Sequence, residues 1–168
     1  MTSKVKVSVI VPVWNDERRV VKCINALKNQ QFAPEAYEII IIDNGSTDST
    51  FEEIQGIEGI NVLQEFKPGS YAARNKGLSV AKGHYVAFTD SDCVPDENWL
   101  VSLIGCAETQ KDIGVVAGDV SFFKDDADII DDASLAYESF FSMNQEEYAR
   151  KGVCITANWL SKKKTLLE

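Results

Sequence analysis

The chain has 168 residues, of which 45% are hydrophobic and 26% are charged, and its formal net charge is −9. This length and composition are typical of one globular domain with a substantial core, and they exclude an intrinsically disordered chain. An acidic balance without a basic stripe argues against a nucleic-acid-binding surface. Any anionic ligand would therefore need positive charge supplied locally.

The predicted elements alternate between strands and helices. The first strand, 5–13, is rich in β-branched residues, and Val20, Ile24 and Leu27 then recur at helical spacing. A run of four isoleucines in the strand 38–42 is typical of a strand covered on both faces. Ser49 and Glu52 form a capping box that predicts a short helix.

The second half of the chain continues the alternation. We expect strands at 60–66, 84–89 and 113–117, and a weaker final strand at 153–160. We expect helices at 71–82, 96–109 and 127–150, and the last of these is either one long helix or two short ones. On the helix 96–109, Trp99, Leu103 and Cys106 are expected to share one side. The β-α order predicts an α/β fold in a single domain, with a mostly parallel sheet and helices on both faces.

Cysteine and histidine usage excludes several kinds of site. Cys23, Cys93, Cys106 and Cys154 are far apart and show no zinc spacing, so we expect reduced core or strand residues in a cytoplasmic protein. The single histidine, His84, has no visible partner, which argues against a histidine-dependent triad.

Two features bear on membranes. No apolar run approaches the roughly 18 residues that span a bilayer, and no signal peptide is expected before the first strand. The three lysines at 162–164 fit a solvated end best, and contact with the inner face of a membrane is the second interpretation.

The most informative motif is Asp90-Ser91-Asp92, directly after the apolar strand that ends at Thr89. In extended backbone, residues two apart project to the same side at a spacing of roughly 6.6 Å, so both carboxylates can reach one hard cation. Aspartates at strand ends are also common turn formers. The loop after the first strand lacks Gly-x-Gly-x-x-Gly, so a bound diphosphate would need a cation as its counter-charge.

Four segments in order make the chain resemble the inverting family 2 glycosyltransferases, which transfer sugars from nucleotide diphosphate sugars and have the Rossmann-like GT-A fold. They are Val9-Ile10-Val11-Pro12-Val13-Trp14-Asn15, Ile42-Asp43-Asn44-Gly45-Ser46-Thr47-Asp48, Ala73-Arg74-Asn75-Lys76-Gly77-Leu78 and Phe88-Thr89-Asp90-Ser91-Asp92. In this family the last segment is the DXD motif.

The resemblance implies roles for particular residues. Pro12, Val13 and Glu17 would edge the nucleoside pocket, and Asp43 would accept a hydrogen bond from the base, with UDP-sugars favoured as donors. Arg74 would flank the nucleotide. The remaining implied site residues are Asp90 and Ser91 on the ribose or sugar side, Asp90 and Asp92 at the Mg²⁺ or Mn²⁺ ion, and Asn158 beside the donor sugar and the acceptor.

Simpler interpretations stay open for the same residues. Asp43 can merely cap the turn that follows it, as can Ser46 and Thr47. Arg74 can be an ion-pair partner of one of the aspartates, and Trp14 can be a packing residue in a loop.

The reaction implied by the resemblance is a single displacement with inversion, in which the metal stabilises the leaving diphosphate and a carboxylate base deprotonates the acceptor, which is an unknown saccharide, lipid or protein. In the family this base lies downstream of the segment that matches Ala157-Asn158-Trp159, and the residues from there to Glu168 hold no aspartate. We therefore expect residues 1–168 to be a C-terminally truncated GT-A domain that binds the donor and lacks the acceptor and base region, with the base beyond Glu168.

Three other classes of protein are alternatives to this interpretation. A phospho-acceptor receiver domain would place an acidic pair after its first strand, where this chain has Pro-Val-Trp-Asn. A sugar nucleotidyltransferase would need a Gly-rich, Arg-containing loop at the same place. A glycosyltransferase-like scaffold without catalysis is the main alternative.

Overall fold

The computed structural model of the chain describes residues 5–109, 113–123, 133–134, 136–137 and 145–168. Its strands are β1 (Val7–Val13), β2 (Tyr37–Asp43), β3 (Asn61–Gln64), β4 (Tyr85–Thr89), β5 (Val115–Ala117) and β6 (Asn158–Lys162). Its helices are α1 (Val20–Lys28), η1 (Pro34–Ala36), α2 (Thr50–Gln55), α3 (Ser70–Val80), α4 (Trp99–Thr109), α6 (Gln145–Arg150) and α7 (Lys163–Leu167). The alternation predicted from the sequence is confirmed for β1 through α4.

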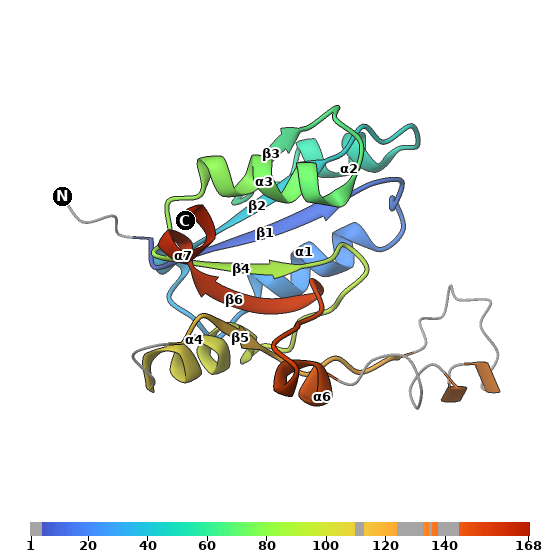
Figure 1. Ribbon diagram of the computed structural model, residues 1–168. Coiled ribbons are helices and arrows are strands. Elements are labelled where there is room, and N and C mark those ends of the chain that lie inside the picture. Colours follow the sequence, from blue (N-terminus) through green and yellow to red (C-terminus); the bar gives the residue numbers. More distant parts are fainter. Residues whose placement is uncertain (1–4, 110–112, 124–132, 135, 138–144) are drawn as a thin grey trace.

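One sheet contains all six strands in the order β3-β2-β1-β4-β6-β5 (Figure 1). The pairs β3–β2, β2–β1 and β1–β4 are parallel, whereas β6 is antiparallel to both β4 and β5. The strand order reverses between β1 and β4, which run side by side. In open α/β sheets such a switch point is where ligands bind, outside the carboxyl ends of the strands.

Helices cover both faces of this sheet, as predicted. The odd-numbered residues of β1 pack with α1 and α4, in a core that includes Val9, Leu27 and Leu100. On the opposite face Ile10 packs with Ala73 of α3. Because side chains alternate along a strand, the apolar runs of β1 and β2 feed both cores at once.

Gly77 lets α3 lie close against β1. A Cβ at this position would come within 2.5 Å of Ile10 Cγ2. The glycine therefore fixes the depth at which α3 packs, and α3 is the helix that carries Arg74 to the carboxyl edge of the sheet.

Several local expectations were wrong. The capping box does not form, because the side chain of Ser49 makes no cap hydrogen bond. Instead the Thr50 N–H donates to Asp48 Oδ1 (3.0 Å), and the Ser49 N–H donates to Glu17 Oε2 (3.1 Å). Cys106 was expected on the same side of α4 as Trp99 and Leu103, but it is exposed, and Ala107 is buried on that side instead.

The C-terminal third differs most from the prediction. The last strand begins at Asn158, not at 153, and it runs antiparallel to β4. Most of the predicted helix 127–150 lies outside the described residues, and its end is α6. The lysines 162–164 belong to β6 and α7, and Lys163 Nζ donates to the Ala81 carbonyl at 2.6 Å.

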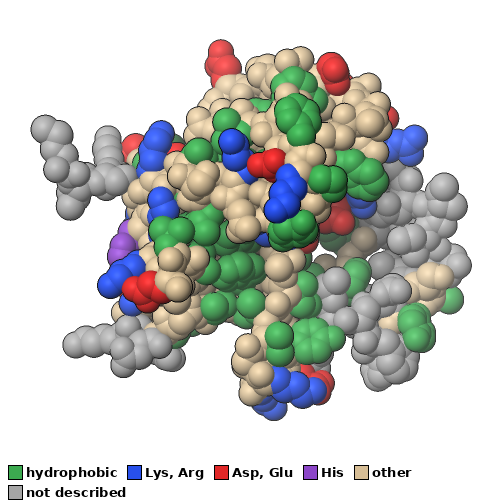
Figure 2. All heavy atoms as spheres, turned by 45° about the horizontal axis from the view of Figure 1, so that its top comes forward, with side chains coloured by type: hydrophobic (Ala, Val, Ile, Leu, Met, Phe, Trp, Pro, Cys, Tyr) green, Lys and Arg blue, Asp and Glu red, His purple; other side chains and the backbone are tan. Residues whose placement is uncertain are grey.

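Charge is mixed over the surface. Acidic and basic side chains of the described residues lie interspersed on the face shown in Figure 2. Among the described helices, none is long and apolar enough to cross a bilayer.

Candidate donor and metal site

The parallel strands β2, β1 and β4 bring three loops to one edge of the sheet. Asp43 ends β2, Val13 pairs with it at the end of β1, and Thr89 ends β4. The segments that follow these strands carry most of the residues that the sequence singled out. The structure therefore places the motifs of the first 92 residues at one edge.

The first loop is tied to the loop that follows β2. Asn15 has a positive φ of 49° and connects the two loops twice: its N–H donates to Ser46 Oγ at 3.0 Å, and its Oδ1 accepts from the Thr47 N–H at 2.8 Å. The exposed Glu17 accepts from the Ser49 N–H in the same loop. Trp14 is 64% exposed, so the interpretation of Trp14 as a packing residue is wrong.

Asp43 is fully buried at the end of β2. Its Oδ1 accepts from the Ser46 N–H at 3.2 Å, and its Oδ2 accepts from Gln64 Nε2 at 3.2 Å. The carboxylate therefore has the turn-capping role that the sequence left open. Contact with a base stays a prediction. Pro12 and Val13 are buried within β1, and their contact with a nucleoside also stays a prediction.

Arg74 and Asp90 form an ion pair across the edge. Arg74 Nη2 donates to Asp90 Oδ1, which is the structural role that the sequence left open for this arginine. Arg74 Nε is buried without a hydrogen-bond partner among the described residues. Burial raises the pKa of the Asp90 carboxyl above its usual range, the positive charge of Arg74 opposes this rise, and the negative charge of Asp92 adds to it.

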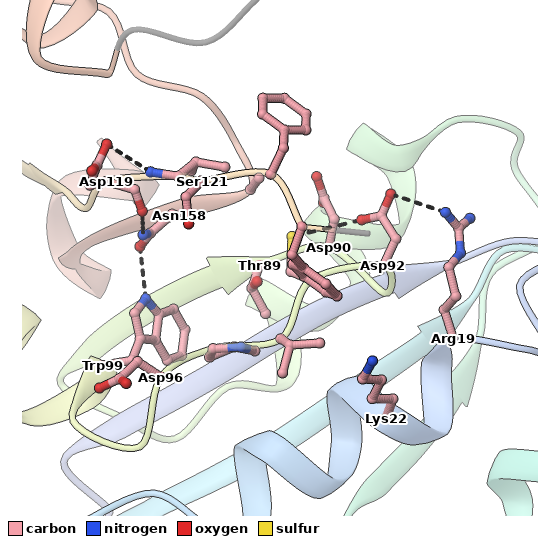
Figure 3. A pocket seen from close by; sticks show the side chains of 17 residues that line it. Arg19, Lys22, Thr89, Asp90, Asp92, Asp96, Trp99, Asp119, Ser121 and Asn158 are labelled. Carbon is pink, nitrogen blue, oxygen red and sulfur yellow. Dashed lines mark hydrogen bonds and ion pairs between the residues drawn. The ribbon is translucent and has the colours of Figure 1, made fainter. Parts of the chain in front are cut away.

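Asp92 differs from Asp90 in being half-exposed, and it faces a cavity. Arg19 Nη1 lies 3.7 Å from Asp92 Oδ2 (Figure 3). The Cys93 thiol donates to Asp92 Oδ1 at 3.7 Å, and the Cys23 thiol donates to the Asp90 carbonyl at 3.5 Å.

Burial raises the pKa of the Cys93 thiol to about 11, and it also raises the pKa of the Cys23 thiol. All four cysteines are free, as predicted, but only Cys23 is buried, and the other three lie neither in the core nor in a strand. Carboxylate oxygens are the ligands that hard divalent cations prefer.

The cavity beside Asp92 has a volume of about 540 Å³ and lies between the segments 89–96 and 119–123, α4 and β6. Asn158 forms part of its wall: Trp99 Nε1 donates to Asn158 Oδ1 at 2.7 Å, and Asn158 Nδ2 donates to the Asp119 carbonyl at 2.7 Å (Figure 3). A Cβ on Gly118 would meet the Asn158 amide at 2.5 Å, so this glycine makes room for it. The Asn158 side chain is thus held in place with its oxygen and nitrogen both bonded.

The predicted site residues divide into two groups. Asp90, Asp92 and Asn158 line the cavity, whereas Pro12, Val13, Glu17, Asp43, Arg74 and Ser91 do not. Two positioning residues were missed: the buried Asp16, which accepts from Ser91 Oγ, and the buried Gln30, which joins α1 to the start of α4. A polar residue beside a helix end was the only signal for either, because the partners Ser91, Asp96 and Leu100 lie 66 to 75 positions away.

The carboxylates of Asp90 and Asp92 suit a hard divalent cation. No group of three or more possible ligands from His, Cys, Asp and Glu occurs within the described part of the chain. Mg²⁺ is usually bound in proteins through one or two carboxylates together with substrate phosphates and water. Two carboxylates beside a cavity therefore fit a cation that arrives with a diphosphate.

Fold and site together define an α/β domain of the GT-A kind. The sequence model of glycosyl transferase family 2 matches residues 8–167, so the chain belongs to this family. It is 33% identical over 158 residues to glycosyltransferase AglE of Haloferax volcanii, which covers 90% of this chain and 51% of AglE. It is also 37% identical over 117 residues to glycosyltransferase GlyG of Streptococcus pneumoniae, which covers 67% of this chain and 38% of GlyG. The chain thus spans about half or less of the length of these relatives.

Solved structures agree with the fold. A crystal structure of Staphylococcus aureus TarS in complex with UDP-GlcNAc matches with a TM-score of 0.55 and 30% identity, over 62% of this chain and 31% of the TarS chain. Glucosyl-3-phosphoglycerate synthase from Mycobacterium tuberculosis in complex with UDP matches with a TM-score of 0.64 over 95% of this chain and 57% of that chain. The synthase is 20% identical, so it supports the fold alone.

Proposed function

We propose that this domain binds a nucleotide diphosphate sugar, with UDP-sugars favoured, as the donor part of a glycosyltransferase. The observation that carries the proposal is the meeting of Asp43, the Arg74–Asp90 pair and Asp92 at the carboxyl edge of β2, β1 and β4. The UDP-GlcNAc complex of TarS, at 30% identity, supports the choice of a UDP-sugar.

Asp90 and Asp92 would hold Mg²⁺ or Mn²⁺, which supplies positive charge to the diphosphate as it leaves. The mannosyltransferase PcManGT from Pyrobaculum calidifontis, in complex with GDP-Man and Mn²⁺, matches this chain with a TM-score of 0.61 over 70% of this chain and 36% of its own, at 23% identity. A net charge of −9 makes local positive charge necessary for an anionic donor. Arg19 and Arg74 supply part of it.

The donor sugar would enter the cavity beside Asp92. Its volume of about 540 Å³ falls within the usual range of roughly 300–1,000 Å³ for small-molecule sites. Its wall combines the Trp99 ring with the fixed amide of Asn158. Small-molecule sites typically combine apolar and aromatic side chains with a few fixed polar groups in this way.

For the complete reaction we propose a single displacement with inversion onto a saccharide, lipid or protein acceptor. Residues 1–168 would supply the donor-binding part of the GT-A domain. The carboxylate base, expected beyond Glu168, stays a prediction, as does the identity of the acceptor.

Calorimetric titration with UDP, GDP and their sugars, with and without Mn²⁺, tests the donor site. We expect UDP and a UDP-sugar to bind more tightly with Mn²⁺, and Asp92→Asn to remove the effect of the metal. Glu53→Gln, an exposed acid on α2, is the matched control and should bind as the wild type does. Binding that ignores Mn²⁺ in the wild type would contradict the metal assignment.

A scaffold without catalysis is the remaining alternative, and sugar transfer by the chain would exclude it. Donor binding without release of UDP in the presence of any acceptor would support either the scaffold or a separate base region. Robust sugar transfer by the 168-residue chain would contradict the expectation that the base lies beyond Glu168.

A further inference from the structure

Asp16 is a buried carboxylate with a partner at each oxygen. It is 6% exposed, and it lies in the loop between β1 and α1. Its Oδ1 accepts from Arg19 Nε at 2.7 Å, and its Oδ2 accepts from Ser91 Oγ at 2.6 Å. Because burying a charge is costly unless it is paired and hydrogen-bonded, these two partners offset the cost of placing the Asp16 carboxylate here.

The backbone of Asp16 is held as firmly as its side chain. Its N–H donates to Thr50 Oγ1 at 2.8 Å at the start of α2, and its carbonyl accepts from the Val20 N–H at 3.2 Å at the start of α1. The carboxylate therefore projects from a point that two helices and β1 fix together.

The fixed carboxylate of Asp16 holds the Asp90-Ser91-Asp92 turn by a hydrogen bond. Ser91, the central residue, is bonded to Asp16, while Asp90 is bonded to Arg74 from α3. The turn is thereby held from both faces of the sheet. Arg19, whose Nε is bound to Asp16, also reaches toward Asp92 (Figure 3).

We propose that Asp16 is a positioning residue that orients the Asp92 carboxylate for a divalent cation, acting through the hydroxyl of Ser91 and the guanidinium of Arg19. The inference rests on the proposed metal role of Asp92. Groups that contact a metal ligand directly, as Arg19 contacts Asp92, typically change metal affinity by 10- to 100-fold when they are removed. Ser91 is accordingly the link between Asp16 and the neighbouring Asp92.

The test measures the Mn²⁺ concentration that gives half-maximal UDP binding, together with the UDP affinity at saturating Mn²⁺. For Ser91→Ala we expect the first quantity to rise about tenfold, because Asp92 loses its orientation, while the second stays within about twofold. Ser91→Thr keeps the hydroxyl and should restore the wild-type value. Ser102→Ala, an exposed serine on α4, is the matched control.

Asp16→Asn should raise the half-maximal Mn²⁺ concentration as well, and adding Ser91→Ala to it should cause little further change. Since Asp16→Asn alters a buried charge and can unfold the domain, Ser91→Ala carries the test by itself. An unchanged Mn²⁺ requirement in Ser91→Ala, or an equal loss of UDP affinity at saturating Mn²⁺, would overturn the inference alone. Wild-type binding of UDP that is independent of Mn²⁺ would overturn the proposed metal role of Asp92 and this inference with it, and no binding of UDP at all would overturn the proposed function.

Discussion

At the scale of single residues, the four aspartates at the carboxyl edge of the sheet differ in burial and in hydrogen-bond partners. Asp16 and Asp43 are buried and hydrogen-bonded, Asp90 is paired with Arg74, and Asp92 is half-exposed beside the cavity. Only the last combines exposure with an open approach. This difference makes Asp92 the best candidate for direct contact with a cation.

The Arg74–Asp90 pair should contribute measurably to stability. Arg74→Leu leaves the partly buried Asp90 carboxylate without its charged donor, and we expect the free energy of unfolding to fall by about 1–3 kcal/mol. Urea denaturation of the metal-free protein measures this.

The matched control is Arg150→Leu, which removes an exposed i,i+4 pair with Glu146. Exposed pairs contribute about 0–1 kcal/mol, so this variant should stay close to the wild type. Equal decreases in the free energy of unfolding of the two variants would show that the Arg74–Asp90 pair stabilises the protein no more than an exposed pair does.

At the scale of elements, two contacts fix how helices meet the sheet and each other. Gly77 sets the distance between α3 and β1, and Gln30 joins the end of α1 to the beginning of α4. Gln30 donates to the carbonyl of Asp96, which lines the cavity, whereas Gly77 does not line it, and each contact positions an element that carries site residues. They can be tested by stability alone.

Gly77→Ala should destabilise the protein by about 1–3 kcal/mol, because the new methyl group would lie within 2.5 Å of Ile10 Cγ2 in a close-packed core. Gly105→Ala in α4 is the control, since a Cβ there meets nothing within 4 Å. Removing a glycine from the interior of a helix should raise the free energy of unfolding by about 0.5–1 kcal/mol. Thermal denaturation would contradict this account if both substitutions shifted stability in the same direction.

Gln30→Ala should lower the free energy of unfolding by about 1–3 kcal/mol. The buried amide donates to the carbonyls of Ala26 and Asp96 and accepts from the Leu100 N–H, and all three groups lose a partner. Gln31→Ala removes an exposed side chain from the next position and should change stability little. Guanidinium denaturation of the two variants gives the comparison, and indistinguishable midpoints would contradict the bridging role of Gln30.

The sequence predicted helices and strands correctly where the hydrophobic periodicity agrees with the local turn and cap residues. The four isoleucines of β2 and the spacing of Val20, Ile24 and Leu27 in α1 predicted these elements within a few residues. Local signals failed where a distant residue competes for the same group. Asp48 and Glu17 cap the start of α2 in place of Ser49, and Glu17 lies 32 positions from its partner.

The same limit explains what was missed in the site. The sequence indicated Asp43, Arg74 and Asp92 through motifs, but it gave no means of pairing Asp16 with Ser91 across 75 positions. The antiparallel direction of β6 was equally hidden, because a short strand pattern does not show which way a strand runs in the sheet. The order of the predicted strands showed which residues reach the carboxyl edge of the sheet. Only the packed structure shows which of these residues form hydrogen bonds or ion pairs with one another.

At the scale of the whole molecule, an acidic domain presents its open carboxylates at the switch point between β1 and β4. The sheet order brings the loops after β2, β1 and β4 together, and the cavity extends from Asp92 toward β6. In the proposed site, the nucleotide would lie over the parallel half of the sheet and the sugar toward the antiparallel half.

The most direct test of the metal and donor site is the anomalous scattering of manganese from a crystal of this protein grown with UDP and Mn²⁺. The account predicts one anomalous peak within coordination distance of an Asp92 carboxylate oxygen, on the side of the motif that faces the cavity, with the diphosphate as a further ligand. A diphosphate bound at this edge with no manganese beside Asp92, or a manganese ion bound elsewhere in the molecule, would contradict it.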